Sequence, residues 1–188
     1  MRPTHLLIAT LALAGLSLAC GDDDAEPVSV GPGVILTGTP KVTPRLQGSW
    51  VISSTPAFTG CGALNVLYEA QSVLTIAQVG GDIRFTLTDT CGRPIPGGEG
   101  TVDFNQIVEL TAKTSRFLTT TCGLVIEQVR TGTVATPADQ FSGSDVLTIT
   151  PVDQPGLDDC DASLPCTVTG TFSATRCIRD VCAVACTP

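Results

Sequence analysis

The chain has 188 residues and a formal net charge of −8, with 43% hydrophobic residues and only 15% charged residues. This acidity excludes a nucleic-acid binder, which needs clustered lysine and arginine against phosphates. The low charge and ample apolar content exclude a wholly disordered chain, and no apolar run is long enough to form a membrane-spanning helix.

The first segment of the chain has the pattern of an export signal. Arg2 supplies a positive charge, and the 14 residues from Leu6 to Ala19 (LLIATLALAGLSLA) are apolar or small. This length is typical of a signal-peptide core and too short to span a bilayer. The sequence therefore predicts a signal peptide over residues 1–19.

The end of this segment, Leu16-Ser17-Leu18-Ala19-Cys20, resembles the lipobox of bacterial lipoproteins. The resemblance implies cleavage before Cys20 and attachment of acyl chains such as palmitate to that cysteine, which anchors the protein in a membrane. Gly21, in place of the Asp that retains such proteins at the inner membrane, favours the outer membrane over the periplasmic face of the inner one. Ordinary secretion with an incidental Cys20 is the alternative.

The only histidine, His5, lies in the predicted signal peptide. A mature chain without histidine lacks the base of Ser-His-Asp and Cys-His catalysis and the commonest metal ligand. We therefore expect no enzyme, no cofactor and no metal site.

A spacer follows Cys20 and completes the segment 20–45. It contains Pro27, Pro32, Pro40 and Pro44, begins with three aspartates, and shows little periodicity. Prolines favour an extended form, so the segment is interpreted as a tether between membrane and domain. In the alternative, Val34 to Leu36 (VIL) dock on the domain as an extra strand.

Residues 46–188 are long enough to bury a core of their own. Segments in which apolar residues alternate with polar ones are rich in threonine, valine and isoleucine, as is typical of strands. Gly, Pro and Asp separate these segments. The clearest example is 83–88 (IRFTLT). Eight strands are predicted, at about 47–54, 72–79, 83–90, 100–104, 107–121, 124–134, 141–150 and 167–176. Sequential hairpins favour an all-β, antiparallel up-and-down barrel; a β-sandwich is the alternative.

Eight cysteines remain after Cys20, an even number in an exported domain, and they predict four disulfides. Strand parity places five of them at one rim of the barrel (Cys61, Cys91, Cys122, Cys160 and Cys166) and three after the last strand (Cys177, Cys182 and Cys186). Two odd groups cannot both pair internally, so at least one bridge joins the rim to the C-terminal tail. Either the tail folds back along the barrel, or the last strand ends early.

The first predicted strand opens with Gly48-Ser49-Trp50, which resembles the Gly-x-Trp motif of lipocalin-like barrels. The resemblance implies that Trp50 closes one end of the barrel and packs against an arginine at the end of the last strand, here Arg176. Parity places both residues at the same end. A generic core tryptophan is the alternative for Trp50.

The predicted function is non-catalytic binding, of a small apolar ligand inside the barrel or of a protein at the rim loops. The candidate inward-facing, ligand-lining residues are Ile83, Phe85, Leu87, Val102, Phe104, Val108, Leu110, Leu124 and Ile126. A small barrel either fills its interior or keeps room for one ligand. The alternative is therefore a structural envelope protein with a solid core; a hydrolase is the third possibility.

Overall fold

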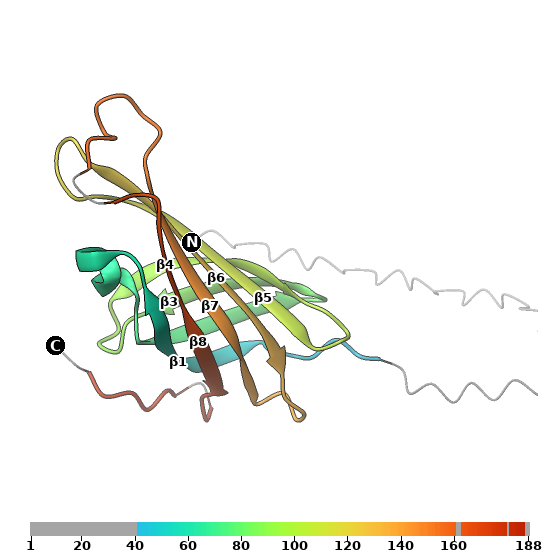
Figure 1. Cartoon of the computed structure of the whole chain (residues 1–188). Coiled ribbons are helices and arrows are strands. Elements are labelled where there is room, and N and C mark those ends of the chain that lie inside the picture. Colours follow the sequence, from blue (N-terminus) through green and yellow to red (C-terminus); the bar gives the residue numbers. More distant parts are fainter. Residues whose placement is uncertain (1–40, 161–162, 180, 187–188) are drawn as a thin grey trace, which may run out of the picture. The chain divides into compact units, whose positions relative to one another are not determined.

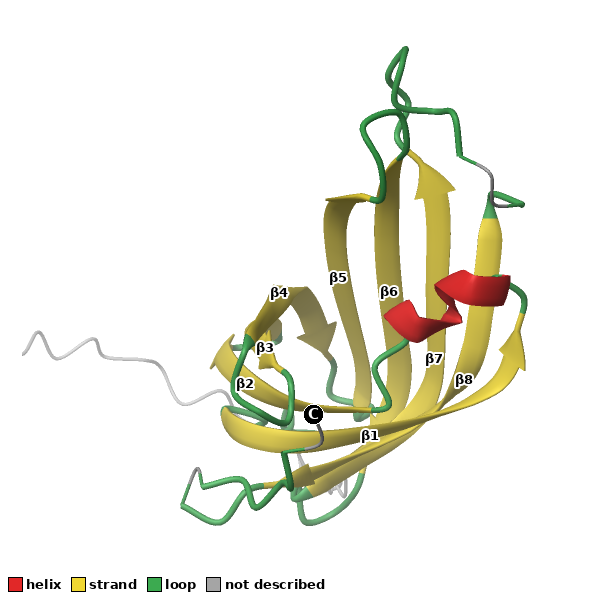
Figure 2. Ribbon diagram, turned by 90° about the vertical axis from the view of Figure 1, so that its left-hand side faces the viewer, coloured by secondary structure: helices red, strands yellow, loops and turns green. Residues whose placement is uncertain are grey.

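A computed structural model describes residues 41–160, 163–179 and 181–186. Eight antiparallel strands close into a barrel in which each strand pairs with the next and β1 pairs with β8 (Figures 1 and 2). The predicted up-and-down barrel is confirmed, and the sandwich alternative is wrong. The strands are β1 (Gly48–Thr59), β2 (Gln71–Val79), β3 (Asp82–Thr88), β4 (Pro94–Val102), β5 (Ile107–Phe117), β6 (Gly123–Val134), β7 (Gln140–Pro151) and β8 (Cys166–Arg176).

The predicted signal peptide, Cys20 and the spacer up to residue 40 lie outside the described residues. One 3-10 helix, η1 (Gly62–Leu67), interrupts the loop between β1 and β2. Among the residues that the structure describes, no helix has the length and apolar character needed to cross a membrane.

Alternation of apolar and polar residues gives the barrel an inner and an outer face. In β3, Ile83, Phe85 and Leu87 are buried, whereas Arg84 and Thr86 between them are exposed. Successive side chains of a strand point to opposite faces, so one face enters the core. Each such buried side chain contributes about 1.5–3 kcal/mol to stability.

One end of the barrel, which we call the closed end, carries the turns β2–β3, β4–β5 and β6–β7. Residues 41–47 cross this end: Gln78 Nε2 donates a hydrogen bond to Pro44 O (2.8 Å), and Leu46 N donates one to Gln78 Oε1 (2.6 Å). Leu46 is fully buried, and its carbonyl accepts a hydrogen bond from Trp50 Nε1 (2.8 Å). The last residues of the predicted spacer therefore lie against the barrel.

Trp50 and Arg176 meet at the closed end. The Arg176 guanidinium lies over the Trp50 ring, 4.5 Å from its centroid. Its Nη1 donates a hydrogen bond to Gln47 O (2.7 Å) and its Nη2 donates one to Arg45 O (2.6 Å). The arginine thus ties the entering chain to the end of β8.

Three strands differ from the prediction by four residues or more. β1 continues to Thr59 instead of ending near 54. β4 begins at Pro94 and ends at Val102 instead of covering 100–104, and β5 ends at Phe117 instead of continuing to 121. Phe104, predicted to face the interior, lies in the β4–β5 turn and is 54% exposed. Phe104 is therefore removed from the interior residues, because the strand that was to carry it has already ended.

The opposite end, which we call the rim, opens between β4 and β5. Pro96 and Gly97 of β4 oppose the single Thr86 of β3, because the pairing shifts between Phe85 and Leu87. Such a bulge bends its strand. Pairing of β4 with β5 ends at Gly98 and Ala112, whereas β5 to β8 continue as long arms beyond the short strands β2 to β4 (Figure 2).

The interior is filled by two apolar clusters. The larger lies toward the closed end and includes Trp50, Leu74 and Phe141, and the smaller lies toward the rim and includes Leu124 and Ile149. Inward-facing glycines make room for large side chains: a Cβ on Gly98 would lie 2.8 Å from Phe85 Cζ, and one on Gly132 would lie 3.1 Å from Phe172 Cζ. Small and large residues alternate in this way to fill small barrels.

The four predicted disulfides are confirmed, and their pairing is Cys61–Cys166, Cys91–Cys186, Cys122–Cys160 and Cys177–Cys182. Among these, Cys91–Cys186 is the required bridge between the rim and the tail. Since β8 continues to Arg176, the tail must fold back, and Figure 1 shows it running from the end of β8 toward the side on which η1 lies.

Candidate functional site at the barrel rim

A pocket of about 220 Å³ opens at the rim, where β4 separates from β5. Its floor is apolar, and Arg116, Glu69 and Gln128 add polar groups. The apolar lining residues are Leu67, Leu87, Ile95, Pro96, Ala112, Ile126 and Leu147. We call this cavity the mouth pocket. It is smaller than the ~300–1,000 Å³ typical of sites that enclose a whole drug-sized ligand.

The strand β5 lines the mouth pocket with five consecutive residues, from Ala112 to Arg116. Successive side chains of a strand point to opposite faces, so side chains alone cannot account for all five. The pocket must instead run along the edge of β5, where backbone groups contribute to its wall. This edge is free because β4 pairs with β5 only as far as Ala112.

The carbonyl directions identify which backbone groups face the opening. Ile107 O accepts a hydrogen bond from Asp103 N (3.0 Å) across the β4–β5 turn. A Cβ on Gly98 of β4 would lie 1.9 Å from Thr111 O, so that carbonyl also faces β4. Backbone direction alternates along a strand, so the N–H and C=O groups of Lys113 and Ser115 face the same side, beyond the end of the β4 pairing.

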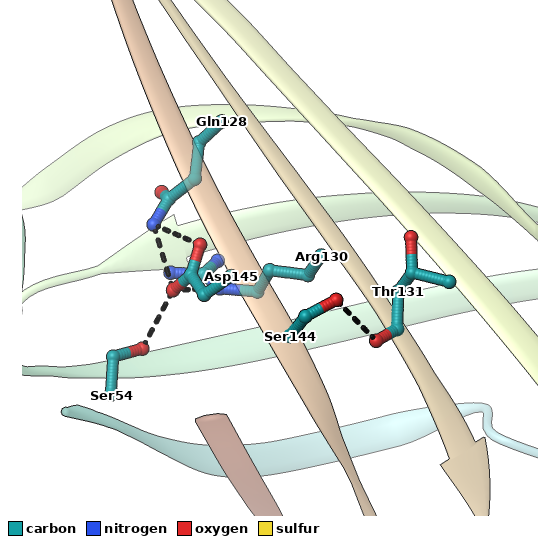
Figure 3. Close-up of polar contacts among 6 residues, drawn as sticks. All are labelled: Ser54, Gln128, Arg130, Thr131, Ser144 and Asp145. Atoms are coloured by element: carbon teal, nitrogen blue, oxygen red, sulfur yellow. Dashed lines mark hydrogen bonds and ion pairs between the residues drawn. The ribbon is translucent and has the colours of Figure 1, made fainter. Parts of the chain in front are cut away.

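Beneath the mouth pocket lies a buried polar layer, at strand positions between those of the two apolar clusters. Figure 3 shows the hydrogen bonds and the ion pair of this layer. Asp145 on β7 is fully buried and Arg130 on β6 is 2% exposed. Arg130 Nε donates a hydrogen bond to Asp145 Oδ2 at 3.2 Å, and Ser54 Oγ donates one to the same oxygen at 2.9 Å. Gln128 Nε2 donates to both Asp145 oxygens, at 3.0 and 3.1 Å, and lies between the pocket and the ion pair.

The single tyrosine, Tyr68, lies beside this layer. Burial, followed by the negative charge of Asp145, raises the pKa of the Tyr68 hydroxyl to about 12. The hydroxyl packs against Gly170, where an added Cβ would lie 2.6 Å from the oxygen. The tyrosine is therefore held neutral inside the rim and has no accessible role as an acid or base at neutral pH.

The predicted ligand-lining residues divide between core and pocket. Only Leu87 and Ile126 line the mouth pocket. The other inward-facing ones pack in the filled interior: Ile83, Phe85, Val102, Val108 and Leu110 toward the closed end, and Leu124 toward the rim. The interior along the barrel axis is thus packed with side chains, and the mouth pocket lies at its rim end.

Sequence reasoning missed the buried ion pair and the free edge. Arg130 and Asp145 occupy inward positions of neighbouring strands and stand directly opposite each other in the pairing. Opposite charges at matching inward positions of two predicted neighbouring strands could have predicted this ion pair. The free edge depends on where β4 bends, which the alternation pattern does not encode.

A wider crevice of about 720 Å³ lies among the rim loops, beside the Cys122–Cys160 bridge. Two of its lining residues, Cys160 and Ser163, flank residues 161–162, which lie outside the described part of the chain. The described residues therefore form only part of the wall of this crevice. Within the described ranges, no group of three or more His, Cys, Asp or Glu side chains is arranged to hold a metal ion.

Comparisons with models of protein families, with curated proteins and with solved structures gave no match for this chain.

Proposed function

We propose that this chain is an exported, lipid-anchored binding protein of the bacterial cell envelope, which holds an apolar group of its ligand in the mouth pocket. The observation that carries the proposal is the apolar floor of that pocket, formed by residues such as Leu87, Ile95 and Ile126 at the open rim. Concave, mostly apolar sites with a few polar groups are the usual form of ligand sites.

The cysteine pairing supports the anchor. The eight cysteines from Cys61 to Cys186 form four bridges, so Cys20 is the one cysteine that they leave over. Cys20 also stands at the position where the lipobox pattern places the acylated cysteine. Disulfides form in oxidising compartments outside the cytosol, which agrees with export.

The size of the pocket supports a role in binding part of a ligand. A volume of about 220 Å³ suits one apolar group of a larger molecule, whose remainder extends past the rim. Arg116 and Glu69, both exposed at the pocket, are placed to contact that remainder. A second candidate function, a structural envelope protein, is favoured by the filled interior at the closed end.

The proposal is tested by native mass spectrometry of the protein purified from its own host, with Ala112→Trp as the test variant. Ala112 faces the pocket, so an indole ring there should fill it. Thr133→Trp adds the same ring on the outer face of β6, where Thr133 is exposed, and serves as the control. A bound mass that is lost in Ala112→Trp and kept in Thr133→Trp supports the proposal. Its repeated absence from the unchanged protein overturns the proposal and leaves the structural role.

A further inference from the structure

We propose that the ligand at the mouth pocket is an extended segment of a partner protein, which adds to the free edge of β5 as an extra strand. This inference rests on the proposed function and names the chemical class of its ligand. It follows from the backbone groups that face the opening, which an apolar small molecule would leave unused.

The free edge presents the hydrogen-bonding groups that a strand requires. Lys113 and Ser115 direct their N–H and C=O groups toward the side that β4 has left, while β5 remains paired with β6 as far as Phe117. An extended peptide can satisfy such groups by strand addition, a common mode of peptide recognition. The opening therefore suits a peptide backbone.

Native sheets usually block such edges, and the two sides of the opening differ in the devices that they carry. β4 carries Pro94, Pro96 and a bulge at this point. Proline lacks an N–H group and bulges disrupt pairing, so β4 is a poor template for another strand. β5 has no proline or bulge between Ala112 and Phe117, but it carries the positive charges of Lys113 and Arg116. Such charges disfavour an uncharged or basic strand. The added strand should therefore pair with β5 only when it supplies a complementary acidic residue.

The residues on the inner face of β5 indicate which side chains the partner segment should carry. Thr114 and Arg116 line the mouth pocket from this face. In an antiparallel pair, directly opposed residues lie on the same face. The residue opposite Thr114 would enter the apolar pocket, and the residue opposite Arg116, two positions earlier in the segment, would meet the guanidinium.

Arg116 selects an acidic residue at that earlier position. It is exposed and forms no ion pair within the described ranges, where the two ion pairs are Arg93–Asp89 and Arg130–Asp145. The inferred pattern is therefore acidic–x–apolar in an extended segment, with the apolar side chain in the pocket and the carboxylate on Arg116.

The test uses a synthetic peptide, acetyl-Thr-Ile-Thr-Glu-Thr-Leu-Thr-amide, and the oxidised full chain with Ser115→Pro. The pattern ends one residue after the leucine, because β4 already pairs with β5 at Ala112. The proline removes the backbone N–H of Ser115 from the free edge. No hydrogen bond to β6 is lost, because this N–H faces the opening and not β6. Ser115→Ala keeps the N–H group and is the matched control. Loss of this hydrogen bond should weaken peptide binding about tenfold, while Ser115→Ala should bind within about twofold of the unchanged chain.

Two further measurements make the test independent of the proline variant's folding. Peptide binding to the unchanged chain should slow hydrogen exchange at the amides of Lys113 and Ser115, and N-methylation of the peptide backbone should abolish binding. Arg116→Glu should reverse the preference, so that a peptide with Lys in place of Glu binds more tightly.

The outcomes separate this inference from the proposed function. Equal peptide affinity for Ser115→Pro and Ser115→Ala, or no binding at millimolar peptide, overturns strand addition. If Ala112→Trp still removes a co-purifying small molecule in that case, the pocket binds ligand in another way and the proposed function stands. Exchange protection that grows with protein concentration in the absence of peptide would assign the edge to a second copy of this chain and overturn the partner segment.

Discussion

Arg130 and Asp145 form an ion pair in the middle of the barrel, with 3% and 0% of their side-chain surfaces exposed. Removing water from two charges is costly, and the attraction and the hydrogen bonds from Ser54 and Gln128 offset that cost only while both partners are present. The pair links β6 to β7 at one register, because the two residues stand opposite each other.

Arg130→Met should therefore lower the free energy of unfolding by about 3–5 kcal/mol, since it leaves the Asp145 carboxylate buried without its counter-charge. The double variant Arg130→Met with Asp145→Leu should recover most of that loss, because an apolar pair needs no compensation. Urea unfolding at neutral pH measures both. Arg93→Ala, which breaks the exposed Arg93–Asp89 pair, is the control and should change stability little. Equal losses in the single and double variants would contradict this view of the pair.

Tyr68 should make the barrel sensitive to alkaline pH. Its pKa is raised from 10.0 to about 12 in the folded chain, so the unfolded chain loses this proton first as the pH rises. Stability from this group is complete below about pH 10 and declines between pH 10 and 12. Because Tyr68 is the only tyrosine, the absorbance of tyrosinate titrates it alone. Tyr68→Phe should remove this part of the pH dependence, and a midpoint near 10 in the folded protein would contradict the prediction.

At the scale of structural elements, the C-terminal tail is held to the barrel by the Cys91–Cys186 disulfide. This bridge is more accessible to solvent than the two that join the rim loops. Cys91 and Cys186 are both exposed, whereas Cys61, Cys122 and Cys166 are at most 7% exposed. Access governs the rate of thiol–disulfide exchange, so the buried bridges should react more slowly.

Mild reduction should therefore open Cys91–Cys186 before Cys61–Cys166 and Cys122–Cys160, and alkylation followed by peptide mapping identifies the order. Cys91→Ser with Cys186→Ser should keep the barrel folded while lowering stability by about 2–4 kcal/mol, because this bridge closes a loop of 95 residues in the unfolded chain. Earlier alkylation of Cys122 or Cys166 would show that the rim opens before the tail.

The elements that the sequence predicted well are those with strict alternation, such as β3. The start of β4 was missed because Pro94, Pro96 and Gly97 disfavour a regular strand, yet these residues pair with β3 through a bulge. β5 was predicted to continue to residue 121. It ends at Phe117, and its neighbour β4 leaves it already after Ala112. Where a strand loses its partner depends on the bend of another strand, and local patterns do not report it.

At the scale of the whole molecule, parity was the most informative property of the sequence. An even or odd count of crossings predicted which cysteines share a rim and that one bridge must return from the tail. The same count placed Trp50 and Arg176 together, and they lie 4.5 Å apart as guanidinium carbon to ring centroid. The volume left inside the barrel depends on how individual side chains pack, so the filled core could not be predicted.

The proposed anchor is also a property of the whole molecule. Cys20→Ala should move the protein from the membrane fraction to the soluble fraction, because the acyl chains provide the membrane affinity in the proposed anchoring. Cell fractionation measures this, and Cys91→Ser with Cys186→Ser, which removes cysteines without changing the predicted lipobox, is the control. Membrane association that persists in Cys20→Ala would contradict lipidation at that residue.

The return of the tail brings Lys41 and Cys186, the first and last described residues, to opposite ends of the barrel. Residues 41–47 enter across the closed end, whereas Cys186 is bonded to Cys91, three positions before β4 begins. A purification tag or fluorescent fusion added after Cys186 would therefore start at the rim, the end of the barrel at which the mouth pocket opens. Immobilisation for binding assays should use the N-terminal side, which leaves the opening facing the solution.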